Sequence, residues 1–562
     1  MTPPPVARDD IAEWGRLAGT FDAWRGLEAA GSAQVSTIVF HAVVGLLALL
    51  AFHWSLSGQT RRAFLAVAAL IAGVCLMTGG SDDLRHHVFR TAWLARQIRG
   101  GDLDLLIDDP TTGEVYPIFV FYSLLPYAPS VLLDLAGLSA LTAYRVPLAL
   151  YVLLFAGGLL RLAEDGQGLL DPSRYAAVLL LASPVIAGVF ATRSALAEAS
   201  ALSLVPWAVL ALRSGRAWPF GGILATQIAL HPVVFPQGYA AIVLLAIALY
   251  GGTGAMLRRL AVATPLAFLG AAPFWVPQAV WLDLVGGAPA LRVSFAETFH
   301  SLAGLFEPLS VENLGIAVWL AVLFALPVQR GWRTALLGAA FLLSLALQTE
   351  HLRDITMRIP VLGIGQFVWR LMSLSALLGF GLMLLGAWAI RPPILRALAG
   401  ISIALVAVTL MLGNQHQRTL LFSTPSDLAI EREYLSRNRH WGLAEFRPRY
   451  GALPELCDRL DDARRAIATE ARTGLATTAR YVALFGAPHG FVGYSFEGMP
   501  LEPAGHCGDM LLFGPLDRPG TLVTDETRLR QLLLARVLLG SLLAGVTALA
   551  IRSLAATGRD RT

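Results

Sequence analysis

A short segment directly after an apolar run gathers the side chains that acid–base and phosphate chemistry require. Residues 82–90 contain two carboxylates, two imidazoles and two guanidiniums. Charged side chains at a membrane boundary are costly unless they face water, a ligand or each other. If Ser81 caps a helix, spacings of three and four residues align two overlapping faces. These faces consist of Asp83, His87 and Arg90, and of Asp82, His86 and Arg90.

Such a face offers a base, a titratable hydrogen-bond donor and a cation, which an enzyme acting on a phosphorylated substrate needs. Spacing alone leaves a second interpretation open, in which acids stabilise the positive end of a helix and its basic face is solvated. Either interpretation requires surrounding elements that hold residues 82–90 at a membrane surface.

The composition is that of a membrane protein. Of 562 residues, 56% are hydrophobic and 15% are charged, which is too apolar for a soluble chain of this length. The net charge of +4 lies largely in short loops. It therefore reports topology and does not indicate binding to nucleic acid.

Windows of about twenty nearly uncharged residues predict an all-α polytopic membrane protein with roughly thirteen transmembrane helices. The predicted spans are 34–56, 62–78, 141–163, 174–192, 196–212, 217–231, 233–250, 256–282, 312–328, 333–349, 370–390, 395–413 and 529–553.

Arginine residues predict the orientation of these spans. They cluster in alternate short loops, which the positive-inside rule assigns to the cytoplasm; these are Arg61 and Arg62, Arg161 and Arg174, Arg213 and Arg216, Arg258 and Arg259, Arg330 and Arg333, and Arg391 and Arg396. The same count places the C-terminal tail inside and the N-terminus outside. The external face then receives residues 79–140, 193–195, 231–232, 283–311, 350–369 and 414–528.

Four regions follow from this topology. They are an N-terminal amphipathic segment (1–33), a transmembrane core (34–413) with the external loop 79–140, an external, periplasmic domain (414–528), and a last helix with a cytoplasmic tail (529–562). Short alternating apolar runs in 414–528 predict a small mixed α/β domain. Cys457 and Cys507 lie in this domain and either form a disulfide or remain free thiols.

Residues 116–137 are apolar but carry three prolines and three tyrosines. Proline disrupts helix interiors, and tyrosine favours the membrane interface. We therefore expect a re-entrant or surface-lying element here and not a span.

Five short motifs follow one another in the external segments between about residues 60 and 390. They are Asp83-x-x-x-His87-x-x-Arg90, the Pro/Tyr-rich stretch Tyr116 to Tyr127, Arg193-Ser-Ala-Leu-Ala-Glu198, Phe274-Trp-Val-Pro277 after His231-Pro232, and Gln366-Phe-Val-Trp-Arg370.

In this order the motifs resemble the GT-C superfamily of polytopic membrane glycosyltransferases. The closest resemblance is to a bacterial branch with an Asp-x-x-x-His-x-x-Arg first loop and a Gln-Phe-Pro-Trp-Arg motif. Val368 replaces the proline of that last motif. The resemblance implies an inverting glycosyltransferase that takes a sugar from a polyprenyl phosphate. It would act on a cell-envelope glycan, lipid or protein acceptor at the outer face of a bacterial inner membrane, with envelope-assembly partners also expected.

The resemblance also implies roles for individual residues. Asp83 is the expected catalytic base and Asp82 the second candidate, with helix capping as the alternative for both. The expected donor-phosphate contacts are His87, Arg90, Arg85, Arg370 and Arg193. Their alternatives are a solvated face, snorkelling of Arg370 to lipid headgroups, and a structural pair between Arg193 and Glu198. The expected cavity-lining residues are His86, Glu198, His231, Gln366, Trp369, Tyr116 and Tyr122.

No cofactor is expected apart from the lipid-linked sugar substrate, and no metal-ligand spacing is present. An acidic cluster in the first external loop is read as solvated, with a bound divalent metal as the alternative; it consists of Asp102, Asp104, Asp108 and Asp109. Two other functions remain open. The chain can be a flippase or transporter of lipid-linked glycans, although no inverted repeat is visible, or a non-catalytic GT-C-like scaffold.

Overall fold

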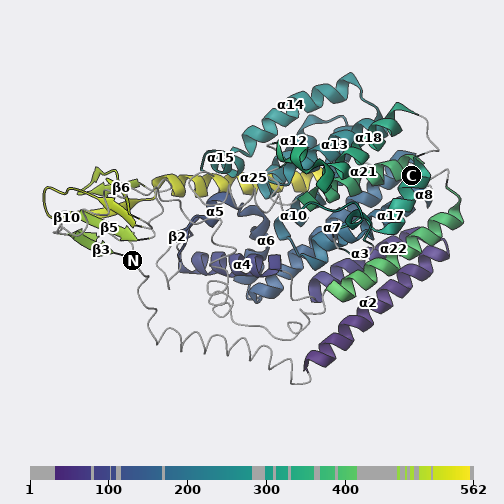
Figure 1. The fold of residues 1–562 in the computed structure, drawn as a ribbon, viewed down its shortest axis with the longest axis horizontal. Coiled ribbons are helices and arrows are strands. Elements are labelled where there is room, and N and C mark those ends of the chain that lie inside the picture. Colours follow the sequence, from purple (N-terminus) through teal and green to yellow (C-terminus); the bar gives the residue numbers. More distant parts are fainter. Residues whose placement is uncertain are drawn as a thin grey trace.

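The computed structural model is mainly helical, with two small sheets near the C-terminal end of the chain (Figure 1). The structure describes residues 32–77, 82–101, 103–108, 115–167, 171–281, 298–307, 310, 312–326, 331–359, 362, 368–386, 390–413, 465–468, 475–477, 481–485, 493–507 and 510–556.

Apolar helices make up the body of the protein. They are α2 (Ser32–Leu56), α3 (Thr60–Met77), α7 (Ala140–Gln167), α8 (Asp171–Leu181), α9 (Pro184–Ala187), α10 (Leu196–Ser203), α11 (Val205–Arg213), α12 (Ala217–Leu230), α13 (Phe235–Tyr250), α14 (Gly254–Gly270), α15 (Ala272–Trp281), α17 (Ile316–Ala325), α18 (Trp332–Ala346), α21 (Leu371–Gly386), α22 (Pro392–Gly413) and α25 (Thr527–Ala556).

Each of the thirteen predicted spans falls on one or two of these helices, but the number of membrane crossings is not confirmed. Within the described residues, six helical segments are long and apolar enough to cross a membrane, or eight if each of two bent pairs forms one span. Five further apolar helices have only 10–17 residues. At 1.5 Å per residue such helices are shorter than a hydrocarbon core of about 30 Å. The chain is thus a helical membrane protein with several short or broken apolar segments.

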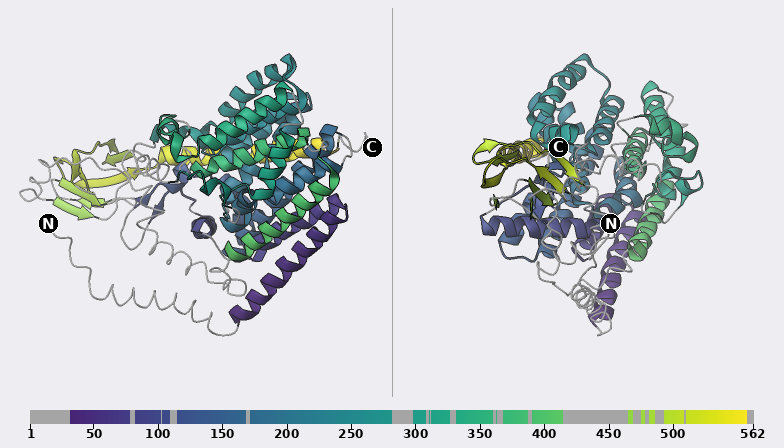
Figure 2. Two further views of the ribbon diagram at one scale, coloured as in Figure 1. Left: turned by 45° about the vertical axis from the view of Figure 1, so that its right-hand side comes forward. Right: turned by 60° about the vertical axis from the view of Figure 1, so that its left-hand side comes forward.

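Burial separates central helices from peripheral ones. The continuous segment Leu196–Arg213, formed by α10 and α11, is almost entirely buried, whereas only 22% of the most apolar stretch of α2 and of α25 is buried. The peripheral helix α2 packs along α3 and α22, as both views in Figure 2 show. Exposed leucines on a peripheral helix are expected where the surrounding solvent is lipid. The central position of α10 matters because its first turn carries Glu198.

Short elements replace a continuous span between residues 115 and 135. They are β2 (Val115–Tyr116), which pairs with β1 (Ile107–Asp108), the one-turn helix α5 (Ile118–Phe121), the 3-10 turn η1 (Leu125–Tyr127) and α6 (Ala128–Leu135). Pro117 precedes α5 and Pro126 lies in η1, where a fixed φ favours short turns over a long helix. The segment is therefore not a transmembrane helix, in agreement with the sequence.

The described part of the predicted external domain consists of strands. One sheet has the order β4-β10-β6-β7 and the other β3-β5-β9-β8. The strands are β3 (Arg465–Ala468), β4 (Leu475–Thr477), β5 (Tyr481–Phe485), β6 (Gly493–Phe496), β7 (Met499–Pro500), β8 (Gly505–Cys507), β9 (Met510–Phe513) and β10 (Gly520–Asp525). The predicted helical part, Cys457 and the side chain of Cys507 lie outside the described residues. Strand β10 leads directly into α25, which runs from the sheets into the helices (Figure 1).

Candidate functional site

Helix α4 (Asp82–Gly100) carries the charged segment that the sequence singles out. The helix begins at Asp82, next to the predicted cap Ser81, which lies outside the described residues. Its apolar side packs against α6 and α7. His87 is 5% exposed and Arg90 is 3% exposed, so this part of the charged face points into the protein. The solvated-face interpretation is therefore wrong for His87 and Arg90.

Four charged side chains form a continuous ion-pair chain. Arg193 Nη2 lies 3.3 Å from Asp83 Oδ2 and 3.0 Å from Glu198 Oε2. The same carboxylate oxygen of Glu198 lies 3.5 Å from Arg370 Nε. The four residues come from α4, the turn before α10, the first turn of α10 and the turn η6 (Val368–Arg370) that leads into α21. The fold thus joins segments that are far apart in the sequence.

The ion-pair chain has a buried end and an open end. The side chains of Glu198 and Arg370 are 3% and 8% exposed, that of Arg193 is 14% exposed, and that of Asp83 is 39% exposed. Burial disfavours a charged group unless partners compensate it, and Glu198 has a guanidinium on either side. Asp83 is the member of this chain that an incoming molecule can reach.

The structural-pair alternative holds for Arg193 and Glu198, because they do contact each other. This contact does not exclude a role in binding, since Arg193 also reaches Asp83 at the open end. Snorkelling to lipid headgroups is wrong for Arg370, whose side chain is buried against Glu198.

A second cluster surrounds His87 and Arg90. Tyr127 Oη lies 2.7 Å from His87 Nδ1 and accepts a hydrogen bond from Arg90 Nη1 at 3.1 Å. The Arg90 guanidinium also lies over the Tyr122 ring, 3.8 Å from its centroid. Such a contact is attractive because the ring face is electronegative. Arg90 is therefore held by two aromatic residues of the segment that follows α5.

The protonation state of His87 follows from its surroundings. Burial lowers the pKa of His87 well below its ordinary value, and electrostatic interactions with Arg90, His86, His231 and Arg193 lower it further. A neutral ring leaves Nδ1 free to accept a hydrogen bond from the Tyr127 hydroxyl, while Arg90 donates a hydrogen bond to the oxygen of the same hydroxyl. His87 consequently orients Tyr127 and does not add a positive charge.

Tyr144 joins the two clusters. Its ring stacks on the His87 ring with centroids 6.0 Å apart and an interplanar angle of 14°. Its hydroxyl donates to the carbonyl of Ser194, the residue after Arg193. Both clusters therefore belong to one site.

The backbone at Ser194 is unusual. Ser194 has a φ of +54°, and it follows the π-helical turn η2 (Gly188–Thr192). A non-glycine residue in the left-handed region costs free energy and persists only where the surrounding structure compensates it. π-Turns are likewise frequent at functional sites. Both irregularities place Arg193 between Asp83 and Glu198.

Acidic groups surround Arg193. Burial lowers its pKa, but the carboxylates of Glu198 and Asp83 raise it more, so that the pKa is raised overall. Glu312, in the loop before α17, contributes in the same direction. The guanidinium thus stays charged in a partly buried position.

The other expected site residues divide into two groups. His231 follows the last residue of α12 and is 8% exposed, and an electrostatic interaction with it contributes to the lowered pKa of His87. The side chains of the second group lie outside the described residues; they are Asp82, Arg85, Tyr116, Gln366 and Trp369.

Of the four carboxylates in the expected acidic cluster, the structure describes only that of Asp104. Asp104 Oδ1 accepts the backbone N–H of Leu106 at 3.0 Å, which is a local turn contact. The other three carboxylates lie outside the described residues. Within the described residues, no three histidine, cysteine or acidic side chains are arranged to hold a metal ion.

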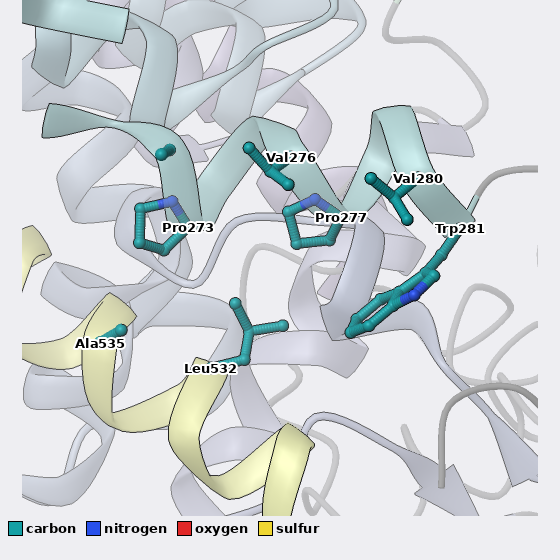
Figure 3. Close-up of a pocket in the computed structure, with 8 residues that line it drawn as sticks. Pro273, Val276, Pro277, Val280, Trp281, Leu532 and Ala535 are labelled. Carbon is teal, nitrogen blue, oxygen red and sulfur yellow. The ribbon is translucent and has the colours of Figure 1, made fainter. Parts of the chain in front are cut away.

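An apolar groove lies between α15 and α25 (Figure 3). Its volume is about 330 Å³, and its lining residues are Ala272, Pro273, Val276, Pro277, Val280, Trp281, Leu532 and Ala535. Gln278 of α15 donates to the carbonyl of Phe121, the residue before Tyr122. The wall of the groove is thereby connected to the segment that holds Arg90.

Sequence reasoning missed four residues of this arrangement. Tyr127 and Tyr144 occur in apolar segments, where a tyrosine hydroxyl needs a buried partner, and this signal was available. Arg536 donates to the carbonyls of Phe119, Val120 and Pro273 beside this cluster, and it was visible in the sequence as a cation within the last apolar run. The positive φ of Ser194 had no signal in the sequence, because serine does not predict it.

Comparisons with known proteins give distant structural neighbours. No protein-family model matches the sequence, and no curated protein sequence matches it. Two cryo-EM structures of the arabinofuranosyltransferase AftD from mycobacteria, one of them a mutant, overlap with this structure at TM-scores of 0.37 and 0.36 and 18% identity. The overlap covers 74% and 73% of this chain but only 30% and 31% of those chains. The function proposed below therefore comes from the site and the sequence motifs.

Proposed function

We propose that this protein is an inverting membrane glycosyltransferase of the GT-C type. It transfers a sugar from a polyprenyl-phosphate donor to a cell-envelope glycan, lipid or protein at the external face of a bacterial inner membrane. One observation carries the proposal: the exposed carboxylate of Asp83 lies at the open end of a buried chain that contains Arg193 and Arg370. The order of the sequence motifs supports the same activity.

Asp83 is the base in this mechanism. Its carboxylate takes the proton of an acceptor hydroxyl as that oxygen attacks the anomeric carbon. The bond between the anomeric carbon and the phosphate oxygen breaks in the same displacement, so the configuration inverts. Asp83 is 39% exposed and is already fixed by Arg193 at 3.3 Å, which orients a carboxylate that a substrate can still reach.

Guanidinium groups stabilise the charge of the leaving phosphate in this mechanism. Negative charge develops on the phosphate as the glycosidic bond breaks, and preorganised cations stabilise it. We assign this role to Arg90 and Arg193, which are linked to each other through Tyr127, His87, Tyr144 and Ser194. Arg370 contacts the same carboxylate oxygen of Glu198 as Arg193, and it thereby helps to hold Glu198 and Arg193 in place.

The hydrocarbon part of the donor requires an apolar surface. The groove between α15 and α25 supplies one, and through Gln278 and Phe121 its wall leads to Tyr122 and Arg90. A lipid phosphate could place its hydrocarbon tail in this apolar groove and its phosphate toward the Arg90 guanidinium. The mechanism uses residues of this chain and the donor substrate, without a cofactor or metal.

Complementation of a deletion strain tests the proposal. Wild type, Asp83→Asn, Asp82→Asn and Arg370→Ala are compared at equal membrane abundance, and lipid-linked and envelope glycans are profiled by mass spectrometry. We expect the deletion and Asp83→Asn to lose one defined sugar while the unmodified acceptor accumulates. Asp104→Asn, a matched change in the same loop at a carboxylate bound to Leu106, should retain full activity.

The same series separates the alternatives. Full rescue by Asp83→Asn would contradict the catalytic assignment and leave a transporter of lipid-linked glycans or a non-catalytic scaffold. Accumulation of the lipid-linked precursor on the cytoplasmic side would indicate the transporter. The ion-pair chain lies at the ends of apolar helices, and its exposed member is the carboxylate of Asp83. This position favours an enzyme over a transporter or a scaffold.

A further inference from the structure

The last helix carries a buried cation that the proposed reaction does not use. Arg536 lies in the apolar helix α25 and is 2% exposed. Its Nε donates to the carbonyl of Pro273 at 2.8 Å and its Nη2 to the carbonyl of Val120 at 2.7 Å, while Nη1 donates to the carbonyl of Phe119. A buried guanidinium is costly and indicates a specific task.

The acceptors of Arg536 identify this task. Phe119 and Val120 belong to the one-turn helix α5, and the last carbonyls of a helix have no partner within it. Arg536 satisfies two of these carbonyls, and Gln278 satisfies the next one, at Phe121. The following residue is Tyr122, whose ring lies under Arg90. Arg536 therefore fixes the backbone that carries Tyr122. Tyr122 is the first aromatic residue of the anion site, by which we mean Arg90 with Tyr122, Tyr127 and His87.

Helix α25 also contacts the turn η1, which carries the second aromatic residue, Tyr127. A Cβ atom at Gly540 would lie 3.4 Å from Leu125 Cδ1 and 3.5 Å from Phe274 Cζ. Leu125 begins the turn η1, which ends at Tyr127. The close approach of α25 to this turn thus depends on a glycine about one helical turn after Arg536.

The same helix makes further contacts in its C-terminal half and at its first residue. The hydroxyl of Thr547 lies 2.7 Å from that of Thr226 on α12, the helix that ends at His231. At its beginning, Asp525 of β10 accepts hydrogen bonds from the backbone N–H and the hydroxyl of Thr527. Helix α25 therefore links the C-terminal sheets to two elements that carry site residues.

We propose that Arg536 is a positioning residue for the anion site. By holding the carbonyls of α5, Arg536 keeps Tyr122 and Tyr127 in contact with Arg90 and His87. The identity of the bound anion rests on the proposed function, whereas the positioning of residues 117–127 does not.

Hydrogen exchange tests the positioning without any ligand. The full chain is reconstituted in nanodiscs, and backbone exchange is measured by mass spectrometry in wild type, Arg536→Lys and Arg536→Met. We expect exchange at residues 118–127 to rise about tenfold or more in Arg536→Met, because two buried carbonyls lose their donor. Arg536→Lys keeps one donor group and should give a smaller rise. Unchanged exchange in both variants would overturn the proposal.

A second pair of variants reaches the same segment by another route. Gly540→Leu pushes on Leu125 and leaves the Arg536 guanidinium in the chain, and its matched control is Gly545→Leu on the same helix, where no atom lies within 4 Å of an added Cβ. We expect increased exchange at 118–127 in the first variant only. If Arg536→Met does not fold, this pair of variants still tests whether contacts from α25 hold residues 118–127 in place.

Binding of farnesyl phosphate then tests the link to the site. We expect Arg536→Lys to weaken binding about tenfold and Arg90→Met to weaken it more. The double variant should bind no more weakly than Arg90→Met alone, because both changes act through the same contact. Additive losses, or unchanged affinity despite faster exchange, would overturn positioning of the anion site. Failure of the wild type to bind would refute the donor proposal, while the exchange result would still decide the role of Arg536.

Discussion

Glu198 and Arg370 lie far apart in the sequence, yet the carboxylate of one lies 3.5 Å from the guanidinium of the other in the interior of the protein. Arg193 shares the same carboxylate oxygen at 3.0 Å and extends the contact to Asp83. Glu198 therefore determines where two guanidiniums stand relative to the exposed carboxylate.

The first prediction concerns stability. Glu198→Gln leaves two guanidiniums without their buried partner, and we expect it to destabilise the protein by about 3–5 kcal/mol. Asp83→Asn alters an exposed pair and should cost about 1 kcal/mol or less. Thermal unfolding in detergent measures both.

The matched control for this comparison is Glu164→Gln, which removes a partly exposed pair with Arg174 at 3.0 Å. Its effect should resemble that of Asp83→Asn. Equal losses for Glu198→Gln and Asp83→Asn would contradict the buried ion-pair chain.

Tyr127→Phe removes the hydroxyl that accepts from Arg90 and contacts His87. We expect farnesyl phosphate to bind about tenfold more weakly, because the Arg90 guanidinium loses the hydroxyl that accepts its hydrogen bond. Tyr239→Phe removes a comparable hydrogen bond to Thr264 and should leave binding unchanged. Equal affinity for the Tyr127→Phe variant and the wild type would exclude this role.

Acid should destabilise the protein through His87. Burial and nearby cations lower the pKa of His87 in the folded state, whereas the unfolded chain binds a proton near the ordinary pKa of about 6.5. The unfolded state then binds more protons below about pH 6.5, so stability falls by about 1.4 kcal/mol per pH unit.

Unfolding temperatures measured between pH 5 and 8 test this dependence. His87→Gln should remove this part of the slope, since glutamine does not titrate. If wild type and His87→Gln keep the same slope, His87 is protonated in the folded state and the assignment is wrong.

The strained residue Ser194 gives the last prediction. Ser194→Gly relieves the cost of a φ of +54° and should leave stability nearly unchanged after the loss of the hydroxyl contact with Ala191. Ser194→Val places a β-branched side chain in the left-handed region and should cost about 1–3 kcal/mol. We also expect it to lower sugar transfer, because Arg193 moves with the turn. A fully active Ser194→Val variant would show that this backbone geometry is dispensable.

The sequence by itself determined the class of protein and the position of its helical segments. Long apolar runs are stable only when they are buried in lipid or in protein. Pro117 and Pro126 preclude a long helix between α4 and α7. Spacing within α4 also placed Asp83, His87 and Arg90 on one face. Local patterns are sufficient for these features because they depend on neighbouring residues.

Only the tertiary structure decided which way that face points and what it meets. The partners of Asp83 and His87 come from the turn before α10 and from η1, and contacts between distant segments leave no local pattern in a single sequence. The same holds for Arg536, which was visible as a charge in an apolar helix but whose three carbonyl acceptors lie in α5 and α15. The number of membrane crossings also depends on tertiary structure, because hydropathy does not distinguish a full span from a short helix buried within the protein.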